Sequence, residues 1–444
     1  MQERHNSIYH TQQYPPSPLE AELIRRIKTD LKTAPPVNKT EEALYDAVEK
    51  LLKKYKTRIT DSAKQTILHH IKASVLGWGK LEPLREDEDI EDISCVGWEY
   101  PLYIYHRTLR DVETDIRFDS AEELDHTVAL FAQKAGKQIS LANPILDATL
   151  EDGSRIQLTF KNVVSPRGST FTIRKFRKTP YSVIDLIKNH TFTVEEMVFL
   201  WFAVEYNRSI LIIGGTASGK TNTLNAITQF IPPLAKIVTL EDTGELMLCH
   251  GNWQPSVVPP ASESITLFDL VTASMRQRPE YLIVGEVRGK ETTAMFQAIN
   301  TGHTSFSTFH AGDFRNAVNR LENPPLNIPQ SMIESLDIVL SQKRFIKGEE
   351  QIRRCTEILE ITGQNETNTV FSYREGEDTA VFSGLSQTCA DICSRTGMNG
   401  EALRQEAERR KAFLLSLLEA DITDFREVAA AINAYRRSDE EEGD

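Results

Sequence analysis

The sequence lacks a long apolar run. No stretch of its 444 residues approaches the roughly 18 apolar residues that a helix needs to cross a bilayer. The opening segment, MQERHNSIYHTQQYPPSP, also lacks the apolar core of a secretory signal. We therefore expect a cytoplasmic protein with no membrane span of its own, which reaches the cytoplasmic face of a membrane only through a partner.

Positive charge is scarce as well. Lysine and arginine number 51 against 64 acidic residues, which gives a net charge of −13. Non-specific binding to nucleic acid takes its affinity from lysine and arginine side chains on phosphates. The charge balance therefore argues against a nucleic-acid partner.

Cysteine is sparse, and its spacing does not fit a structural zinc site. The 5 cysteines form no paired CxxC set. Cys389 and Cys393 are one helical turn apart, but structural zinc usually takes four ligands and no second pair is visible. We expect no zinc, and we interpret these two thiols as part of a half-buried helix.

What is present is the composition of an ordinary globular chain, with 40% hydrophobic and 26% charged residues. Residues 1–57 begin with a polar, proline-punctuated stretch that is typical of a disordered tail. They continue with apolar residues at helical spacing, as at Leu44, Val48 and Leu51. We expect a disordered tail followed by a helical segment.

Residues 58–178 mix helical and strand patterns. A helical stretch at residues 61–77 precedes short strand-like runs, PLYIYH, SRIQLTF and STFTIRKF, around another helical stretch at residues 121–135. This pattern predicts an α+β domain. Residues 179–192 are interrupted by Pro180 and show no long period, so we interpret them as a linker.

Residues 193–378 predict a larger α/β domain. Thr193 and Glu196 have the spacing of a capping box that begins a helix. Apolar runs then alternate with helical stretches: SILII, KIVTLED, YLIVGE, TSFSTFH, LDIVLSQ and RRCTEILEI. Continuous apolar strands separated by helices favour a mainly parallel, covered sheet. Residues 379–444 predict a helical extension that ends in an acidic tail.

The segment GGTASGKT, residues 214–221, matches the phosphate-binding pattern G-x-x-x-x-G-K-[ST] in full. It follows an apolar strand and precedes a helix, so its backbone amides and the helix N-terminus can converge on phosphate oxygens. Lys220 is expected to contact the β- and γ-phosphates, and Thr221 to ligate Mg²⁺. The residues predicted to bind ATP are Gly214, Gly215, Thr216, Ala217, Ser218, Gly219, Lys220, Thr221 and Asn222.

Two later strands end in acidic residues: Glu241 and Asp242 follow one, and Glu286 follows the other. Ligands of an open parallel sheet lie beyond the carboxyl ends of its strands, so we expect these acids near the γ-phosphate. We predict that Glu286 activates the attacking water, and that Glu241 and Asp242 support Mg²⁺ through water. The alternative is that Asp242 and Glu245 cap a following helix.

One expected aspartate is missing. Many ATP-hydrolysing enzymes carry a magnesium-directing aspartate just before the catalytic glutamate, and this sequence has Gly285 there. Because Glu241 and Asp242 can supply carboxylate oxygens for Mg²⁺ in place of that aspartate, we expect the site to be functional rather than defective.

The segment TGHTSFSTFHAG adds two histidines. His310 stands at the carboxyl end of its strand, where it can sense the γ-phosphate through a hydrogen bond. For His303, a functional and a purely structural interpretation stay open.

A basic cluster ends the α+β domain, against the acidic average. Planar guanidinium groups pair with phosphate oxygens in two-pronged fashion, so we predict that Arg155 and Arg174 reach the nucleotide. Alternation in FTIRKF puts Arg174 and Lys175 on opposite faces. We interpret Arg177 and Lys178 as an exposed face that balances nearby acids. The cluster comprises Arg155, Arg167, Arg174, Lys175, Arg177 and Lys178.

In this order, the motifs resemble those of the motor ATPases of type II and type IV secretion systems and type IV filaments. The resemblance is greatest to the branch that serves archaeal pili, archaella and related secretion machines. It runs from about Trp78 to Arg374 and includes NPILDATLEDGSRIQ, GSTFTIRKF, TLEDTGEL, RQRPEYLIVGEVRGKE and TGHTSFSTFHAG. It implies that the Gly-Glu at residues 285–286 is the family's own pattern, and that Arg155 and Arg174 contact nucleotide phosphates.

The resemblance also implies a RecA-like ATPase domain preceded by a PAS-like domain, with ATP and Mg²⁺ as cofactors. It implies a homo-hexamer that acts on a polytopic inner-membrane platform protein. We therefore expect a motor ATPase for filament assembly or protein secretion. Two alternatives stay open: a nucleic-acid translocase on the same core, and an ATP-gated scaffold without turnover.

Overall fold

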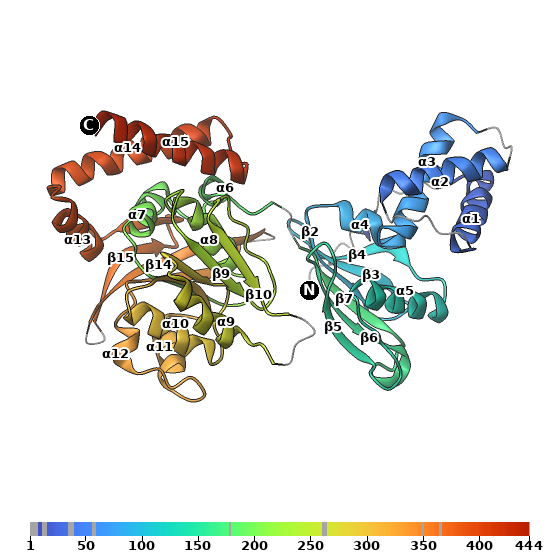
Figure 1. The fold of residues 1–444 in the computed structure, drawn as a ribbon, viewed down its shortest axis with the longest axis horizontal. Helices are drawn as coiled ribbons and strands as arrows, with labels where there is room; N and C mark the ends of the chain where they lie inside the picture. Colours follow the sequence, from blue (N-terminus) through green and yellow to red (C-terminus); the bar gives the residue numbers. More distant parts are fainter. Residues whose placement is uncertain are drawn as a thin grey trace. The chain divides into compact units, whose positions relative to one another are not determined.

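The protein divides into two compact units, Met1–Arg177 and Lys178–Asp444, which are described separately. Figure 1 shows both as a ribbon. Across the described residues, no helix combines the length and the apolar character needed to cross a bilayer. The computed structural model describes residues 8–10, 16–33, 40–55, 59–176, 179–259, 264–347, 350–363 and 366–443.

The first unit contains a small helical cluster. Helices α1 (Pro18–Thr33), α2 (Glu41–Lys54) and α3 (Asp61–Val75) bury their apolar faces against one another. Leu44 and the apolar residues that follow it at helical spacing on α2 are buried in this core. Because α3 packs against α1, the expected domain boundary after residue 57 cuts through one cluster and is wrong.

A seven-stranded sheet forms the rest of the first unit, in the order β1-β4-β3-β2-β7-β6-β5. Neighbouring strands are antiparallel, except that β1 runs parallel to β4. Helix α5 (Ala121–Lys134) packs on the sheet and gives the expected α+β arrangement. The remaining elements are β1 (Ile8–Tyr9), α4 (Glu82–Glu86), β2 (Ile90–Cys95), β3 (Pro101–His106), β4 (Arg110–Arg117), β5 (Ile145–Thr149), β6 (Arg155–Thr159) and β7 (Thr170–Arg174).

Strand β1 lies within the stretch that we expected to be disordered. It pairs with β4, and the Tyr9 hydroxyl donates a hydrogen bond to Asp87. Burial, together with the Asp87 carboxylate, raises the pKa of Tyr9 well above its usual range. The expectation of disorder is wrong for this strand, whereas residues 1–7 and 11–15 lie outside the described residues.

The expected linker, residues 179–192, is largely folded into the second unit. Helix α6 (Val183–Lys188) begins with a capping box between Ser182 and Asp185, and 4 of its apolar side chains are buried in that unit's core. The apolar residues of this stretch therefore form the buried face of a short helix, and the interpretation as a linker is wrong for these residues.

The second unit is built on a nine-stranded sheet, in the order β10-β9-β11-β12-β8-β13-β14-β15-β16. The first six strands of this order, β10, β9, β11, β12, β8 and β13, are parallel. Strands β14, β15 and β16 continue the sheet as an antiparallel meander. The expected mainly parallel sheet is present. Its strands are β8 (Ile210–Gly214), β9 (Ile237–Glu241), β10 (Trp253–Val257), β11 (Tyr281–Val284), β12 (Thr304–His310), β13 (Ile338–Lys347), β14 (Glu350–Gly363), β15 (Glu366–Arg374) and β16 (Thr379–Phe382).

Helices cover both faces of this sheet, so that its central strands are buried at nearly every position. Helix α7 begins with the predicted capping box between Thr193 and Glu196, which is confirmed. One face is covered by α6, α7 (Val194–Glu205) and α8 (Lys220–Ile227), the other by α9 (Leu267–Ser274), α10 (Glu291–Asn300), α11 (Phe314–Glu322) and α12 (Gln330–Ile333).

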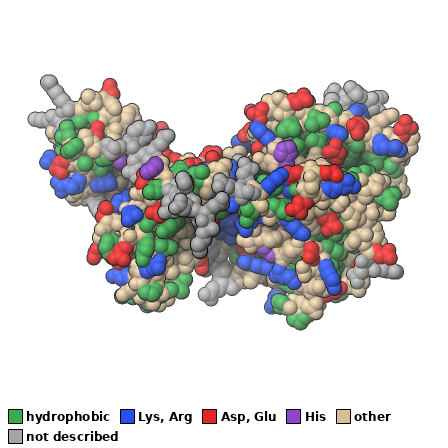
Figure 2. Space-filling view, turned by 180° about the vertical axis from the view of Figure 1, so that it is seen from behind, with side chains coloured by type: hydrophobic (Ala, Val, Ile, Leu, Met, Phe, Trp, Pro, Cys, Tyr) green, Lys and Arg blue, Asp and Glu red, His purple; other side chains and the backbone are tan. Residues whose placement is uncertain are grey.

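Three further helices pack back onto the α7 face of the sheet. They begin later than we expected, because Thr379–Phe382 forms β16 and extends the sheet beyond residue 378. On the face shown in Figure 2, basic and acidic side chains are interspersed on both units. The three helices are α13 (Gln387–Thr396), α14 (Gly400–Glu419) and α15 (Phe425–Gly443).

Candidate active site

The loop between β8 and α8 has the backbone of a phosphate cradle. Ala217 and Gly219 have φ values of 58° and 97°, and left-handed residues of this kind let successive N–H groups face one concave side. Gly214 has no room for a side chain, because a Cβ there would lie 2.5 Å from both the Gln342 carbonyl oxygen and the Ser218 hydroxyl. The loop leads into the N-terminus of α8, which adds partial positive charge.

Lys220 begins α8 and folds back over this loop. Its Nζ donates hydrogen bonds to the carbonyl oxygens of Gly214 and Gly215, at 3.1 and 2.8 Å. The same Nζ lies 3.4 Å from Nδ1 of His310. A buried cation therefore stands at the cradle, where the β- and γ-phosphates of a nucleotide need one.

The strand order brings His310 and Glu286 to the same edge. Strand β12 lies between β8 and β11, and its last residue, His310, pairs in register with Gly214. Glu286 follows the end of β11, and its Oε1 lies 2.8 Å from Nε2 of His310. Lys220, His310 and Glu286 therefore form one line of polar contacts across the carboxyl ends of the strands.

The line of contacts fixes the tautomer of His310. An ammonium group can only donate a hydrogen bond, so Nδ1 of His310 accepts from Lys220 and Nε2 carries the proton that faces Glu286. Both His310 and Glu286 are partly exposed, so that water reaches the carboxylate. This is an arrangement in which a carboxylate can accept a proton from water.

Gly285, which stands where an aspartate was expected, lies close to a side chain of the neighbouring strand β9. Glu241 ends β9 and is 4% exposed. A Cβ at Gly285 would lie 3.1 Å from Cγ of Glu241 and 3.4 Å from its Oε1. An aspartate at this position would press a second carboxylate against a buried one, and glycine leaves the space that Glu241 uses.

The two acids predicted to support Mg²⁺ make hydrogen bonds and ion pairs with other groups of the protein. Glu241 Oε1 accepts hydrogen bonds from the backbone N–H groups of Glu245 and Leu246, at 2.8 and 3.0 Å. Asp242 pairs with Arg288 at 2.8 Å. Strand β9 is three positions away from β8, roughly 14 Å at the usual strand spacing. Mg²⁺ binding by these acids stays a prediction.

The structure decides two alternatives that the sequence left open. Residues 242–252 contain no helix, so the idea that Asp242 and Glu245 cap one is wrong. His303 lies at the amino end of β12, where its Nδ1 is 3.3 Å from the Thr301 hydroxyl. A seven-residue strand, roughly 20 Å, separates it from the edge that carries His310. A site role for His303 is therefore wrong.

In the first unit, Arg155 and Arg174 are direct cross-strand neighbours. Strands β6 and β7 are antiparallel, and the register pairs these two exposed residues. Opposed side chains have Cβ atoms about 4.5–5.5 Å apart, and like charges at that spacing repel. Arg174 is also opposite Asp92 of β2 in the strand register. Burial raises the pKa of this aspartate, and the charge of Arg174 opposes the rise. A bound anion would relieve the repulsion between the two arginines.

Other members of the basic cluster contact their own unit. The guanidinium of Arg167 lies 4.6 Å from the centre of the Tyr100 ring. The Nζ of Lys175 donates to two backbone carbonyls near the end of α4, and burial lowers the pKa of this lysine to about 8. Arg177 and Lys178 lie outside the described residues.

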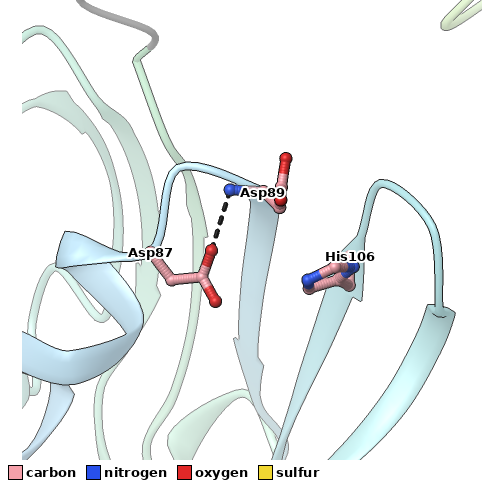
Figure 3. A group of neighbouring side chains, drawn as sticks. All are labelled: Asp87, Asp89 and His106. Carbon is pink, nitrogen blue, oxygen red and sulfur yellow. Dashed lines mark hydrogen bonds between the residues drawn. The ribbon is translucent and has the colours of Figure 1, made fainter.

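Within the described residues, Asp87, Asp89 and His106 bring ligand atoms within 4.8 Å of one another (Figure 3). These groups are already engaged: Asp87 accepts from Tyr9 and from the Asp89 N–H, and His106 Nδ1 accepts from the Thr108 N–H. Neutral His106 therefore carries its proton on Nε2, the nitrogen that would otherwise bind a metal. We interpret the group as a tie that holds β1 to the sheet.

One residue at the phosphate loop was not predicted. Nε of Arg353, on β14, donates a hydrogen bond to the Ala217 carbonyl oxygen at 3.0 Å. The run RRCTEILEI predicted a strand, but the sequence does not say which strand ends beside the loop. The signal in the sequence was the pair of arginines at the start of that run.

Comparison with known proteins identifies the family. Residues 102–411 match the family model described as Type II/IV secretion system protein. The chain is 37% identical to the uncharacterized protein MJ0900 of Methanocaldococcus jannaschii over 393 residues, which cover 86% of this chain and 71% of that protein. It is 31% identical to the conjugal transfer protein TrbB of Rhizobium radiobacter over 230 residues, 50% of this chain and 68% of TrbB.

Among solved structures, the ATPase DotB of Legionella pneumophila covers 80% of this chain and 94% of its own, with 18% identity and a TM-score of 0.49. These values are too low to carry an argument about function. The family match itself includes the phosphate loop and the strands that lead to Glu286 and His310. The chain thus belongs to the type II/IV secretion system family, and the core of its second unit is an α/β sheet with helices on both faces.

Proposed function

We propose that this chain is a motor that hydrolyses ATP to drive filament assembly or protein secretion. The observation that carries the proposal is the line of contacts from Lys220 through His310 to Glu286, beside a phosphate cradle. This line connects Lys220, which is proposed to contact the phosphates, to Glu286, which is proposed to contact the attacking water. Membership of the secretion family supports the cellular role.

In the proposed reaction, ATP binds with its phosphates on the loop and Lys220 on the β- and γ-phosphates. Glu286 accepts a proton from water, whose oxygen bonds to the γ-phosphorus as the bond to ADP breaks. Mg²⁺, held by Thr221 and through water by Glu241 and Asp242, would supply charge neutralisation. Since His310 contacts both Lys220 and Glu286, a change at the phosphates reaches the base.

The arginine pair of the first unit completes the proposal. Arg155 and Arg174 present two guanidinium groups on one face, a geometry suited to phosphate oxygens. Closure of the first unit onto bound ATP would be favoured while the γ-phosphate charge is present and lost when phosphate leaves. Such a cycle converts hydrolysis into movement of one unit against the other.

The proposed assembly is a ring of six in the cytoplasm, seated on a polytopic platform protein of the inner membrane. The family match and the resemblance of the motifs support this assembly. Mass photometry of the purified protein with and without ATP measures the ring directly: six copies with nucleotide are expected, and monomers at every concentration would contradict it.

Phosphate release with Mg²⁺ tests the enzymatic part. Lys220→Ala should release no phosphate. Glu286→Gln should bind ATP like the parent but hydrolyse it at least about 100-fold more slowly, because the general base is lost. Glu280→Gln, at the opposite end of the same strand, is the matched control and should retain the parental rate. Parental turnover in Glu286→Gln would rule out Glu286 as the base, and an inactive parent would rule out the motor.

A further inference from the structure

Arg353 reaches the phosphate loop from the side of the sheet that lies away from Glu286. Strand β13 pairs Gln342 with Gly214 on one side and with Cys355 of β14 on the other. Arg353 lies two residues before Cys355, so the antiparallel β14 delivers it to the carboxyl edge of the parallel strands. The loop is therefore flanked by His310 on one side and by Arg353 on the other.

The contact of Arg353 is with the backbone of the loop. Its Nε donates to the Ala217 carbonyl oxygen at 3.0 Å, and its Cδ lies 3.4 Å from the position of a Cβ at Gly219. Ala217 has a φ of 58°, a conformation that is rare for a residue with a side chain. Arg353 thus bonds to the loop at the residue whose backbone conformation is least favourable.

The direction of this bond fixes the direction of the next amide. In a trans peptide, the carbonyl and the following N–H point to opposite sides. Because the Ala217 carbonyl points to Arg353, the N–H of Ser218 points away from it. Left-handed residues at Ala217 and Gly219 are the kind that gather such N–H groups on one concave side.

We propose that Arg353 is a positioning residue that aims the Ser218 amide into the phosphate cradle, toward the α- and β-phosphates of ATP. The proposal rests on the proposed ATPase function and adds the group that shapes its binding loop. Backbone N–H groups of such a loop cradle the α- and β-phosphates, so their direction sets affinity for the polyphosphate.

Lys220 and Arg353 hold the loop in different ways. Lys220 bonds to the carbonyls of Gly214 and Gly215, and it has to release them to contact phosphates. Arg353 holds its carbonyl on the side away from the Ser218 amide, so its bond persists when nucleotide is bound. An interaction that is equal in the ground state and the transition state affects KM and leaves kcat unchanged.

The variants Arg353→Gln and Arg353→Lys test this role in the full chain with Mg²⁺. Isothermal calorimetry with ADP and steady-state ATP hydrolysis give the dissociation constant, KM and kcat. Arg353→Gln should raise both the dissociation constant and KM about tenfold, with kcat within about twofold of the parent. Arg353→Lys should recover part of the loss, because an ammonium group can donate to the same carbonyl.

Lys343→Gln is the matched control, since Lys343 is an exposed cation on the neighbouring strand β13. It removes the same charge and should leave KM unchanged. The proposal is overturned if Arg353→Gln binds ADP like the parent, or if its kcat falls with KM unchanged. It is also overturned if Arg353→Gln and Arg353→Lys unfold at lower temperature and Arg353→Lys binds ADP no better. An inactive parent would refute the motor, while ADP binding still decides the role of Arg353.

Discussion

At Gly285, the absence of a side chain is a requirement of the packing. A Cβ there would lie within 3.1 Å of Glu241, a carboxylate that is buried against the loop after β9. A second carboxylate beside it would add like-charge repulsion in a poorly solvated place. The residue that follows, Glu286, is then the acid at this strand end that contacts His310.

Gly285→Asp should therefore harm the protein rather than improve its site. We expect the free energy of unfolding to fall by about 1–3 kcal/mol, the usual range for overpacking, with no gain in ATP turnover. Urea unfolding and phosphate release measure both quantities. Gly251→Asp is the control, because a Cβ there has open space around it. A Gly285→Asp protein that is as stable as the parent, or more active, would contradict this explanation.

The site was predictable at the level of motifs, and less so at the level of contacts. Lys220, Glu286 and His310 could be assigned to one edge because each follows or ends a predicted strand of a parallel sheet. Their order across the edge depends on the strand order, which the sequence does not encode locally. Arg353 lies 136 residues from Ala217 along the chain, so no local pattern could relate them.

At the scale of elements, helix α7 carries a buried acid in its capping box. Glu196 is 1% exposed, and burial raises its pKa from 4.5 to about 7. The folded protein therefore binds this proton more tightly than the unfolded chain does. The contribution of Glu196 to stability is fully present below about pH 4.5, and it is lost as the pH rises toward 7.

Glu196→Gln should remove this pH dependence, because glutamine can also close a capping box and does not titrate. Relative to the parent, we expect the variant to gain about 2–3 kcal/mol of stability between pH 4.5 and pH 8. Thermal unfolding of both proteins at the two pH values measures the change. Glu195→Gln, on the adjacent and partly exposed position, should show no such gain. A difference in stability that is the same at both pH values would refute the assignment.

Long elements were predictable and short ones were not. The long strands and helices can be recognised in the sequence from the spacing of their apolar residues and from their capping residues. Helix α6 has 6 residues and β16 has 4, too few to show one, so both were assigned to a linker or an extension. Their form follows from tertiary packing: α6 is buried in the core of the second unit, and β16 pairs with β15.

At the scale of the whole chain, the C-terminal helices are part of the core of the second unit. Arg410 on α14 is 5% exposed, lies 4.8 Å from the centre of a Trp201 ring and pairs with Glu205 on α7. Arg436 on α15 donates to the carbonyls of Phe230 and Ile231, just after α8. The helix that begins at the phosphate loop is thus anchored at its far end by the C-terminal extension.

In the proposed motor, both units act on one nucleotide. The second unit carries the phosphate loop and Glu286, and the first unit carries the paired arginines Arg155 and Arg174. If both units contribute, removal of the arginine pair should slow hydrolysis while the loop still binds ATP. Loss of a guanidinium that stabilises phosphoryl transfer costs about 10³-fold or more in turnover.

The most direct measurement is phosphate release by the double variant Arg155→Gln, Arg174→Gln, beside ATP binding to the same protein. Turnover is expected to fall at least about 100-fold, with ATP affinity within about tenfold of the parent. Arg167→Gln, which removes the guanidinium over Tyr100, serves as the control and should hydrolyse ATP at the parental rate. A double variant that releases phosphate as fast as the parent would show that the first unit plays no part in hydrolysis.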